Sequence, residues 1–392
     1  AEPEPASPNA TALVAKTIKK SVSPLKQIVE LAVYPQAIDL ATGRDYQSFI
    51  AVAKRSDDVT VDVTEQATWK LADKQYARID GNQLHPVADG QTELICQFGG
   101  NEIRVPVEVN RSEEKLPISF EKDIVPVMTR SGCNTGSCHG AARGKDGFMI
   151  SLFGYDPAGD YMRVTREIGM RRINLAVPEE SLFLTKATGQ VTHTGGKLFG
   201  TESVYYQMIL EWLQDGAPAD ATPPPAVTKL EVFPPQAVIE GEGNTQRFIS
   251  VAHYSDGTTR DVTNLSAFIS NNESSAAVDQ HGIVTAGARG EAFVMARFET
   301  KTEGRQVLVL PEDLQYEAPE IAGNYLDQLV GKMLTQLRIL PSGLCTDEEF
   351  LRRVTIDITG LLPTEEDYHQ FLNVAAPDKR SALIENLLSR KE

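Results

Sequence analysis

"RFISVAHYSDGTTRDVT", Arg247 to Thr263, alternates apolar and polar side chains and then turns at Asp256-Gly257. Such alternation is the period of a β-strand with one buried face, and Asp-Gly is typical of hairpin turns. The stretch therefore predicts two antiparallel strands joined by a short turn. Similar short, β-branched segments lie on both sides of it, which predicts a small antiparallel β-sandwich over residues 226–311.

The same pattern occurs twice at one offset. "SDDVTVDVT" begins at Ser56 and "SDGTTRDVT" begins at Ser255, 199 residues later. "LAVYPQAIDL" at Leu31 and "LEVFPPQAVI" at Leu230 are separated by the same number of residues. This period is too long for a solenoid repeat, so it predicts a duplicated domain. The first copy, residues 27–111, is the more divergent sandwich.

The segment between the two copies, residues 117–222, has a different character. It holds five of the seven Met residues and two of the four Cys residues, and it ends in a Pro-rich linker. "SFEKDIVPVMTR" predicts a helix with Ser119 or Asp123 as a possible N-cap. "TESVYYQMILEWLQDGAP" predicts a second helix, with Thr201 as its N-cap and a stop at Gly216.

The two ends of the chain also have distinct patterns. Residues 1–26 are Pro-rich at the start and read as a flexible tail just past a cleavage site. Residues 318–392 are helical in pattern, and Thr346 with Glu349 forms a capping-box signature. The last predicted helix has no element after it to cover its apolar face, so we expect residues 318–392 to be the start of a longer C-terminal domain.

Composition excludes several classes of protein. The chain has 392 residues and a formal net charge of −16, and such a surface repels a nucleic-acid duplex. No apolar run approaches the ~20 residues of a membrane span. Four Cys residues are too few for a disulfide scaffold. No Ser, Cys or carboxylate set has a recognisable nucleophile arrangement, so we favour a non-enzyme and expect any catalysis at the Cys-His cluster of residues 131–140 or in a missing C-terminal part.

The stretch "SGCNTGSCHG", Ser131 to Gly140, contains the main candidate residues for a functional site: two Cys and one His within seven positions. Two thiols followed directly by a histidine are what a c-type haem requires, with Cys133 and Cys138 as thioether anchors and His139 as the proximal axial ligand. The spacing is C-x4-C-H rather than C-x-x-C-H. A metal site and a small disulfide are the alternatives at this point.

A helix before the motif and a Trp-bearing helix after it favour haem. His193, 54 residues after His139, is then the candidate distal ligand of a six-coordinate, bis-His iron. Three methionines are its rivals: Met149, Met162 and Met170. Phe148, Phe153 and Tyr155 are expected to line the haem pocket. Arg163 and Arg166, in a basic cluster with Arg171 and Arg172, are possible contacts of the haem propionates.

The central segment resembles the cytochrome c domains of large exported planctomycete proteins, in which such a domain occurs with bacterial Ig-like group 2 domains. The tail "ILPSGLCTDEEFLRRVTIDITGLLPTEEDYHQFL" resembles the start of a C-terminal domain of unassigned function in that family. The resemblance implies a multidomain α+β chain in which two Ig-like sandwiches flank an all-α, class I-like cytochrome c domain, followed by a helical segment. It also implies export to the periplasm or cell surface.

These observations lead to one functional expectation and two alternatives. The first is a mono-haem cytochrome with one covalent haem c, which transfers electrons to a redox partner protein of unknown identity. The alternatives are a haem enzyme or sensor with a labile sixth ligand, and a carbohydrate-binding or adhesion module with an accessory cytochrome. A monomer is expected, with no nucleic-acid partner and with contact to envelope polysaccharide as a possible role of the sandwiches.

Overall fold

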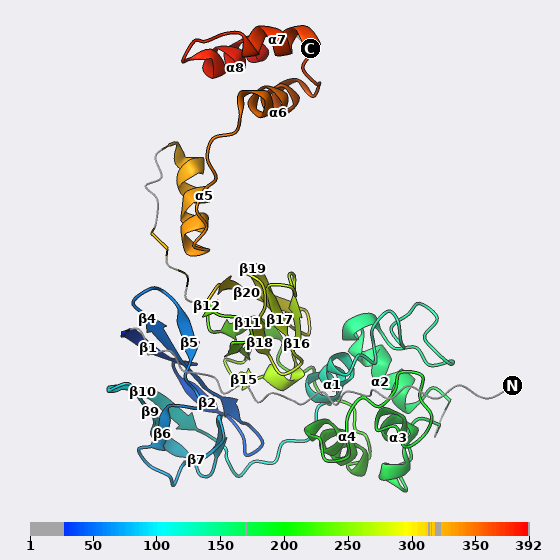
Figure 1. The fold of residues 1–392 in the computed structure, drawn as a ribbon. Coiled ribbons are helices and arrows are strands. Elements are labelled where there is room, and N and C mark those ends of the chain that lie inside the picture. The colour runs from blue at the N-terminus through cyan, green and yellow to red at the C-terminus, as the bar shows by residue number, and fades with distance from the viewer. Residues whose placement is uncertain (1–26, 169–170, 313, 315, 318–322, 391–392) are drawn as a thin grey trace, which may run out of the picture. The chain divides into compact units, whose positions relative to one another are not determined.

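The computed structural model of this protein describes residues 27–168, 171–312, 314, 316–317 and 323–390. The chain divides into two compact units, residues 1–315 and 316–392. Figure 1 shows the strands in the first unit and a purely helical second unit among the described residues. The flexible tail expected over residues 1–26 lies outside the described residues.

The first copy of the repeat forms three small sheets with the strand orders β1-β4-β5, β2-β10-β9-β6 and β3-β8-β7. Strand β2 runs parallel to β10, and the other paired strands are antiparallel. The strands are β1 (Ile28–Tyr34), β2 (Ile38–Leu40), β3 (Gln47–Ser48), β4 (Ile50–Arg55), β5 (Thr60–Asp62), β6 (Thr68–Leu71), β7 (Ala77–Asp80), β8 (Gln83–Pro86), β9 (Gly90–Phe98) and β10 (Asn101–Val109).

The second copy repeats this topology, with the strand orders β11-β14-β15, β12-β20-β19-β16 and β13-β18-β17. Its parallel pair is β12 with β20, the counterpart of β2 with β10. The strands are β11 (Val227–Phe233), β12 (Gln236–Glu240), β13 (Thr245–Arg247), β14 (Ile249–Tyr254), β15 (Thr259–Asp261), β16 (Ala267–Ser270), β17 (Ala276–Val278), β18 (Ile283–Ala286), β19 (Gly290–Phe298) and β20 (Lys301–Leu310).

The offset between the two copies changes once along the chain. Strands β7 and β17 begin at Ala77 and Ala276, which keeps the offset of the earlier segments, whereas β9 and β19 begin one position further apart, at Gly90 and Gly290. One residue is therefore inserted in the second copy, where the connection between β17 and β18 (residues 279–282) is longer than that between β7 and β8 (residues 81–82). Only the turn absorbs this insertion, because a one-residue shift inside a strand would move its buried side chains to the solvent face.

Equivalent side chains fill the two sandwich cores. Phe49 and Phe248 are both fully buried, and they occupy corresponding positions of the repeat. In β9 and β19 the buried residues alternate with more exposed ones, as expected for strands with one face toward the core. Burying one such Phe side chain contributes about 1.5–3 kcal/mol to folding.

The two sandwiches contact each other directly. Tyr34 stacks on Phe233 with ring centroids 5.3 Å apart, over a small cluster formed by Ile50, Val52 and Ile249. Tyr34 and Phe233 are themselves equivalent positions of the repeat, so the copies pack through corresponding strands. Each of these residues precedes a cis proline.

In its described residues, the segment between the sandwiches contains four short α-helices joined by irregular loops. A π-helical turn, Phe120–Ile124, leads into the first helix. Ser119, a predicted N-cap, caps this turn: its side chain accepts a 2.9 Å hydrogen bond from Lys122 N. The last helix is capped by Ser203 rather than the predicted Thr201. The helices are α1 (Val125–Arg130), α2 (Pro157–Thr165), α3 (Leu182–Ala187) and α4 (Val204–Gln214).

This segment packs onto the second sandwich. Trp212 of α4 is fully buried beside Phe120, and the buried residues around it belong to the same hydrophobic cluster as the core of the second copy. Arg260 of β15 forms a 2.8 Å ion pair with Asp123. The guanidinium of Arg297 in β19 lies 4.0 Å from the ring centroid of Phe153.

These contacts correct the expected fold class of two sandwiches flanking an all-α, class I-like cytochrome c domain. The first unit is mainly β-sheet in its described residues, and its helices are only six to eleven residues long. The sandwiches are not held apart by the helical segment, because they touch each other and the segment shares a core with one of them. Contacts between residues so far apart in the chain have no signature in local patterns, so the sequence did not reveal them.

The second unit is helical. Its helices are α5 (Tyr325–Gln336), α6 (Asp347–Thr359), α7 (Glu365–Leu372) and α8 (Lys379–Ser389). The capping box predicted at Thr346 and Glu349 is present at the start of α6. Helix α6 is tied to α8 by ion pairs from Asp347 to Lys379 and Arg380, at 2.6 and 2.7 Å.

Candidate functional site

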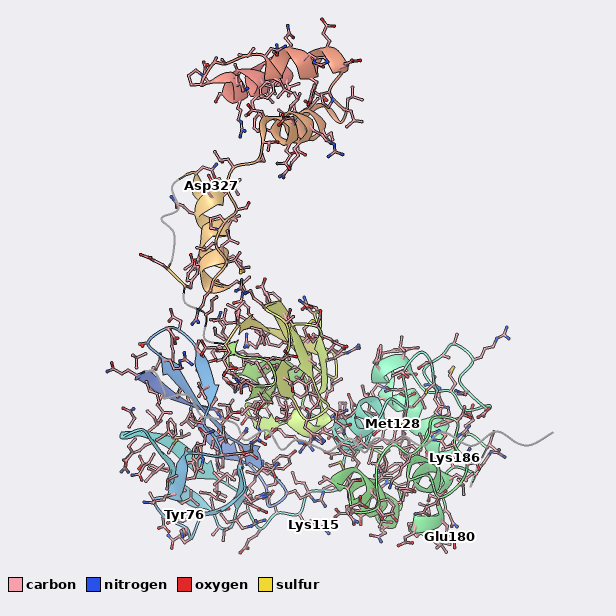
Figure 2. All side chains as sticks on the ribbon, viewed as in Figure 1. Tyr76, Lys115, Met128, Glu180, Lys186 and Asp327 are labelled. Carbon is pink, nitrogen blue, oxygen red and sulfur yellow. The ribbon has the colours of Figure 1, made fainter. Side chains whose placement is uncertain are left out.

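A cavity of about 240 Å³ lies within the helical segment. Its wall is mainly apolar and comes from α1, α3, α4 and the loops between them. Met128 of α1 and Lys186 of α3, both labelled in Figure 2, belong to this wall. The apolar lining includes Val127, Met128, Phe148, Leu182, Phe183, Ala187, Leu198, Phe199 and Ile209.

The cavity brings together His139 and His193, which come from separate loops of the segment. Their rings are parallel to within 7°, with centroids 6.3 Å apart. Nδ1 of His139 lies 2.9 Å from the Phe148 carbonyl oxygen, and Nδ1 of His193 lies 3.0 Å from the Gly196 carbonyl oxygen. Because a carbonyl oxygen only accepts, each Nδ1 carries a proton, and in the neutral form of either ring Nε2 is then the acceptor.

Close packing at two glycines, one against the His193 ring and one in the turn beside His139, leaves no room there for a side chain. A Cβ atom on Gly195 would lie 2.9 Å from Cε1 of His193, and one on Gly140 would lie 2.1 Å from the Asn134 carbonyl oxygen. Burial lowers the pKa of His139 below its usual value, and the nearby His193 lowers it further. His139 therefore stays neutral at pH 7.

The turn that follows α1 carries the two cysteines. His139 N donates a 3.0 Å bond to the Cys133 carbonyl, and Cys138 N donates one of the same length to the Thr135 carbonyl. Of the two thiols, the described wall of the cavity includes only that of Cys133. Burial, with a smaller contribution from Cys138, raises the pKa of Cys133 to about 12, so this thiol stays protonated. All four cysteines of the chain are free thiols in this structure.

One part of the wall is positively charged. Lys145, Arg171, Arg172 and Lys186 line the cavity, and Asp146 is the single acidic residue of its described lining. The Arg172 guanidinium is occupied by hydrogen bonds within the protein, because it donates to the carbonyl oxygens of residues 163, 167 and 147. It also lies 4.3 Å from the ring centroid of Phe148. Burial is the main reason that its pKa is lowered, and the Arg171 charge adds to the effect.

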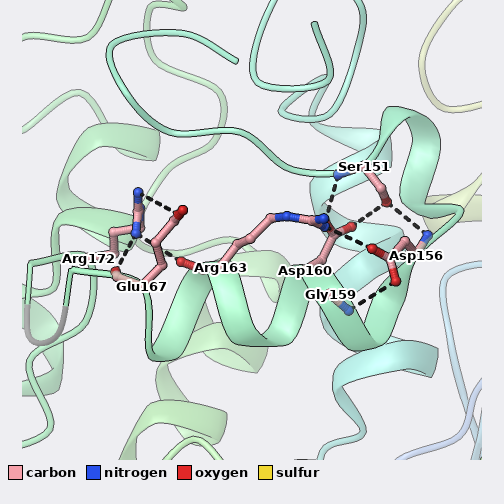
Figure 3. Close-up of polar contacts among 7 residues, drawn as sticks. All are labelled: Ser151, Asp156, Gly159, Asp160, Arg163, Glu167 and Arg172. Carbon is pink, nitrogen blue, oxygen red and sulfur yellow. Dashed lines mark hydrogen bonds and ion pairs between the residues drawn. The ribbon is translucent and has the colours of Figure 1, made fainter. Parts of the chain in front are cut away.

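Helix α2 is anchored by a polar network (Figure 3). Asp160, fully buried, accepts hydrogen bonds from N and Oγ of Ser151 at 2.6 and 2.5 Å. Arg163 forms ion pairs with Asp160 at 2.9 Å and with Asp156 at 3.1 Å. Arg163, a predicted propionate contact, thus takes part in this network, and the described wall of the cavity does not include it.

The remaining predicted site residues are scattered. Phe148 lines the cavity as expected, whereas Phe153 packs under Arg297 and Tyr155 is 75% exposed. Arg166 is exposed, Met162 is 53% exposed and Met149 is half-buried, and the described cavity wall contains none of these three. Met170 lies outside the described residues.

Sequence reasoning missed three polar residues of the wall: Ser131, Lys145 and Lys186. The Ser131 hydroxyl is buried and has no hydrogen-bond partner among the described residues. Ser131 lies inside the quoted Cys-His motif, so its position was visible in the sequence, but its burial was not. Lys186 follows from no motif, because only the folding of α3 brings it to the cavity.

The expectation of one covalent haem c is corrected here. Among the described residues, no group of three or more His, Cys, Asp or Glu side chains is arranged to hold a metal ion. The same finding contradicts the alternative of a tetrahedral metal site formed by Cys133, Cys138 and the two histidines. In the part of the chain that is described, no helix is long and apolar enough to cross a membrane.

Solved structures give only distant likenesses. The chain is similar to the S-layer protein SbsC, domains 5–6, at 13% identity and a TM-score of 0.26, covering 72% of this chain and 98% of that one. For SbsC domains 1–6 the identity is 8% and the TM-score is 0.20. The match covers 74% of this chain but only 29% of the SbsC chain. For invasin, a bacterial integrin-binding protein, the values are 10% and 0.15, covering 71% of this chain and 58% of that one.

No curated protein matches the chain. A family model does match its C-terminal residues, 325–392, which form helices α5 to α8. The expectation that a domain of unassigned function begins in this region is thereby confirmed: residues 325–392 match the family described as PSCyt2, a protein of unknown function (DUF1549).

Proposed function

We propose that this chain is an exported protein of the cell envelope whose helical segment binds one amphipathic small molecule in the cavity between His139 and His193. The observation that carries the proposal is the set of unused polar atoms in an otherwise apolar cavity. In His139 and in His193, Nδ1 makes the backbone contact, so that contact does not use Nε2. The buried Ser131 hydroxyl has no partner among the described residues.

The buried Ser131 hydroxyl, which has no partner among the described residues, needs a physical reason. A buried group without a hydrogen-bond partner costs about 1–3 kcal/mol. A ligand that places a donor near the imidazoles and a polar atom near Ser131 would offset this cost, and its apolar body would cover Met128, Phe183 and Ile209. Ligand sites are commonly apolar cavities with a few converging polar groups, as here.

Export rests on the resemblance of the central segment to domains of exported proteins. Electron transfer at the envelope stays a prediction, and it requires that the bound molecule be redox-active. Polysaccharide contact through the two sandwiches also stays a prediction.

Binding of a fluorescent apolar probe tests the proposal. N-phenyl-1-naphthylamine should bind the full chain at one site with increased fluorescence. Ala187→Phe, which fills the cavity from α3, should abolish this binding. Ala142→Phe is the matched control, because Ala142 is exposed and lies outside the described cavity wall. A probe that binds Ala187→Phe as well as it binds the parent chain would overturn the proposed site.

Native mass spectrometry of the chain, purified from a host that exports it, provides a second test. A bound small molecule should appear as a defined excess mass that Ala187→Phe lacks. The same excess mass on both proteins would place the bound molecule elsewhere.

A further inference from the structure

We infer that the molecule bound in this cavity carries an acidic group, and that Arg171 and Lys186 bind that group. The inference rests on the proposed site and adds the chemical class of its ligand: an amphipathic organic anion with an apolar body. Three observations support it: the positive charge of the wall, the contacts that each cationic side chain makes, and the negative net charge of the chain as a whole.

The wall carries more positive than negative charge. Four of its described side chains are cationic and one, Asp146, is acidic. The chain as a whole has a formal net charge of −16, so this concentration of cations runs against the average of the surface. A cationic wall beside apolar surface raises the local concentration of anions and disfavours cations.

The four cations are not equivalent. Arg172 is held by three backbone carbonyls and by a 3.2 Å ion pair with Glu167, so its role is to shape the loop. Nζ of Lys186 has one long contact, 3.3 Å, to the Thr192 carbonyl oxygen. Among the described residues, no carboxylate pairs with Arg171, Lys145 or Lys186.

Arg171 is also next to Arg172, whose pKa its charge lowers. Two adjacent guanidinium groups repel each other, and an anion bound at Arg171 would offset this repulsion. A guanidinium also binds carboxylate, sulfonate or phosphate oxygens through two parallel hydrogen bonds. The apolar side chains of the same wall would contact the hydrocarbon part of that molecule.

Two probes that differ by one sulfonate group test this inference. The anion 8-anilinonaphthalene-1-sulfonate and the neutral N-phenyl-1-naphthylamine share one aromatic body. The full chain should bind the anion about tenfold more tightly than the neutral probe. In the double variant Arg171→Gln/Lys186→Gln, affinity for the anion should fall to about that of the neutral probe, whose own affinity should not change.

Arg143→Gln is the matched control, because Arg143 is an exposed cation of the same segment outside the described wall. It should leave both affinities unchanged, and circular dichroism of all variants should match that of the parent chain. Equal affinity for the two probes, or an unchanged anion affinity in the double variant, would overturn the anionic ligand. Failure of both probes to bind would instead overturn the proposed site itself.

Discussion

Asp62 and Asp261 occupy equivalent positions of the two sandwiches, and each carboxylate accepts a backbone hydrogen bond from the other copy. Arg247 N donates to Oδ2 of Asp62 at 2.9 Å, and Ser48 N donates to Oδ2 of Asp261 at 2.6 Å. The donors Ser48 and Arg247 are also equivalent. The two copies therefore pack about an approximate two-fold axis, like the halves of an isologous dimer.

Removing Asp261 should destabilise this interface. Asp261 is buried and accepts bonds from Ser48 N and Thr263 N, so Asp261→Ala leaves two buried donors unpaired. We expect a loss of about 2–4 kcal/mol in the free energy of unfolding. Guanidinium denaturation measures it, with Asp80→Ala on the exposed surface as the control. A loss for Asp261→Ala no larger than that of an ordinary surface substitution, about 0.5 kcal/mol, would contradict the interface.

The sandwiches illustrate what the sequence can predict. Alternation around Ser56 and Ser255 predicted strands and a hairpin, because one buried face imposes a period of two. The reciprocal bonds of Asp62 and Asp261 were not predictable, because nothing local in "DVT" shows that its carboxylate accepts a bond from a distant strand. The fold-class error has the same origin: it treated the segments as separate domains, and the contacts between them join residues far apart in the chain.

Part of the candidate site could also be predicted from the sequence. Cys133, His139, Phe148 and His193 were expected near one another, and all four line the cavity. Their grouping followed from the Cys-His motif and from the helices around it. Phe153 and Tyr155 were assigned to the same pocket from proximity in sequence alone, but the loop before α2 turns them away. Phe153 has a positive φ of 55°, an unusual conformation that residue patterns do not predict.

Glu299 should make stability fall as the pH rises. Burial, and then the nearby charge of Glu121, raise the pKa of Glu299 from 4.5 to about 7. The folded chain therefore favours the protonated form, so this stability is fully present below pH 4.5 and is lost as the pH rises toward 7. Glu299→Gln should flatten this slope and stabilise the chain at pH 8 by about 1–3 kcal/mol, with allowance for partial exposure. Denaturation at pH 5 and pH 8 measures the change, and an equal slope in both proteins would contradict it.

His139, unlike Glu299, should make the stability of the chain fall as the pH is lowered. Its pKa lies below the usual 6.5 because burial disfavours the charged form. Its contribution to stability is present above pH 6.5 and is lost as the pH falls through the folded pKa. Nuclear magnetic resonance of the imidazole protons should show His139 titrating below an unfolded reference. A His139 that titrates at or above 6.5 would contradict the buried, neutral ring.

The Cys133 thiol should resist alkylation in the folded chain. Its pKa of about 12 leaves almost no thiolate at pH 7.5, and the thiolate is the reactive form. We expect iodoacetamide to modify Cys133 at least about a hundredfold more slowly in the native chain than after unfolding in guanidinium. Mass spectrometry of the peptide that contains Cys133 and Cys138 measures both rates. Rapid modification of the native chain would contradict the burial, and a Cys133 that stays unmodified after unfolding would show that the thiol is not free.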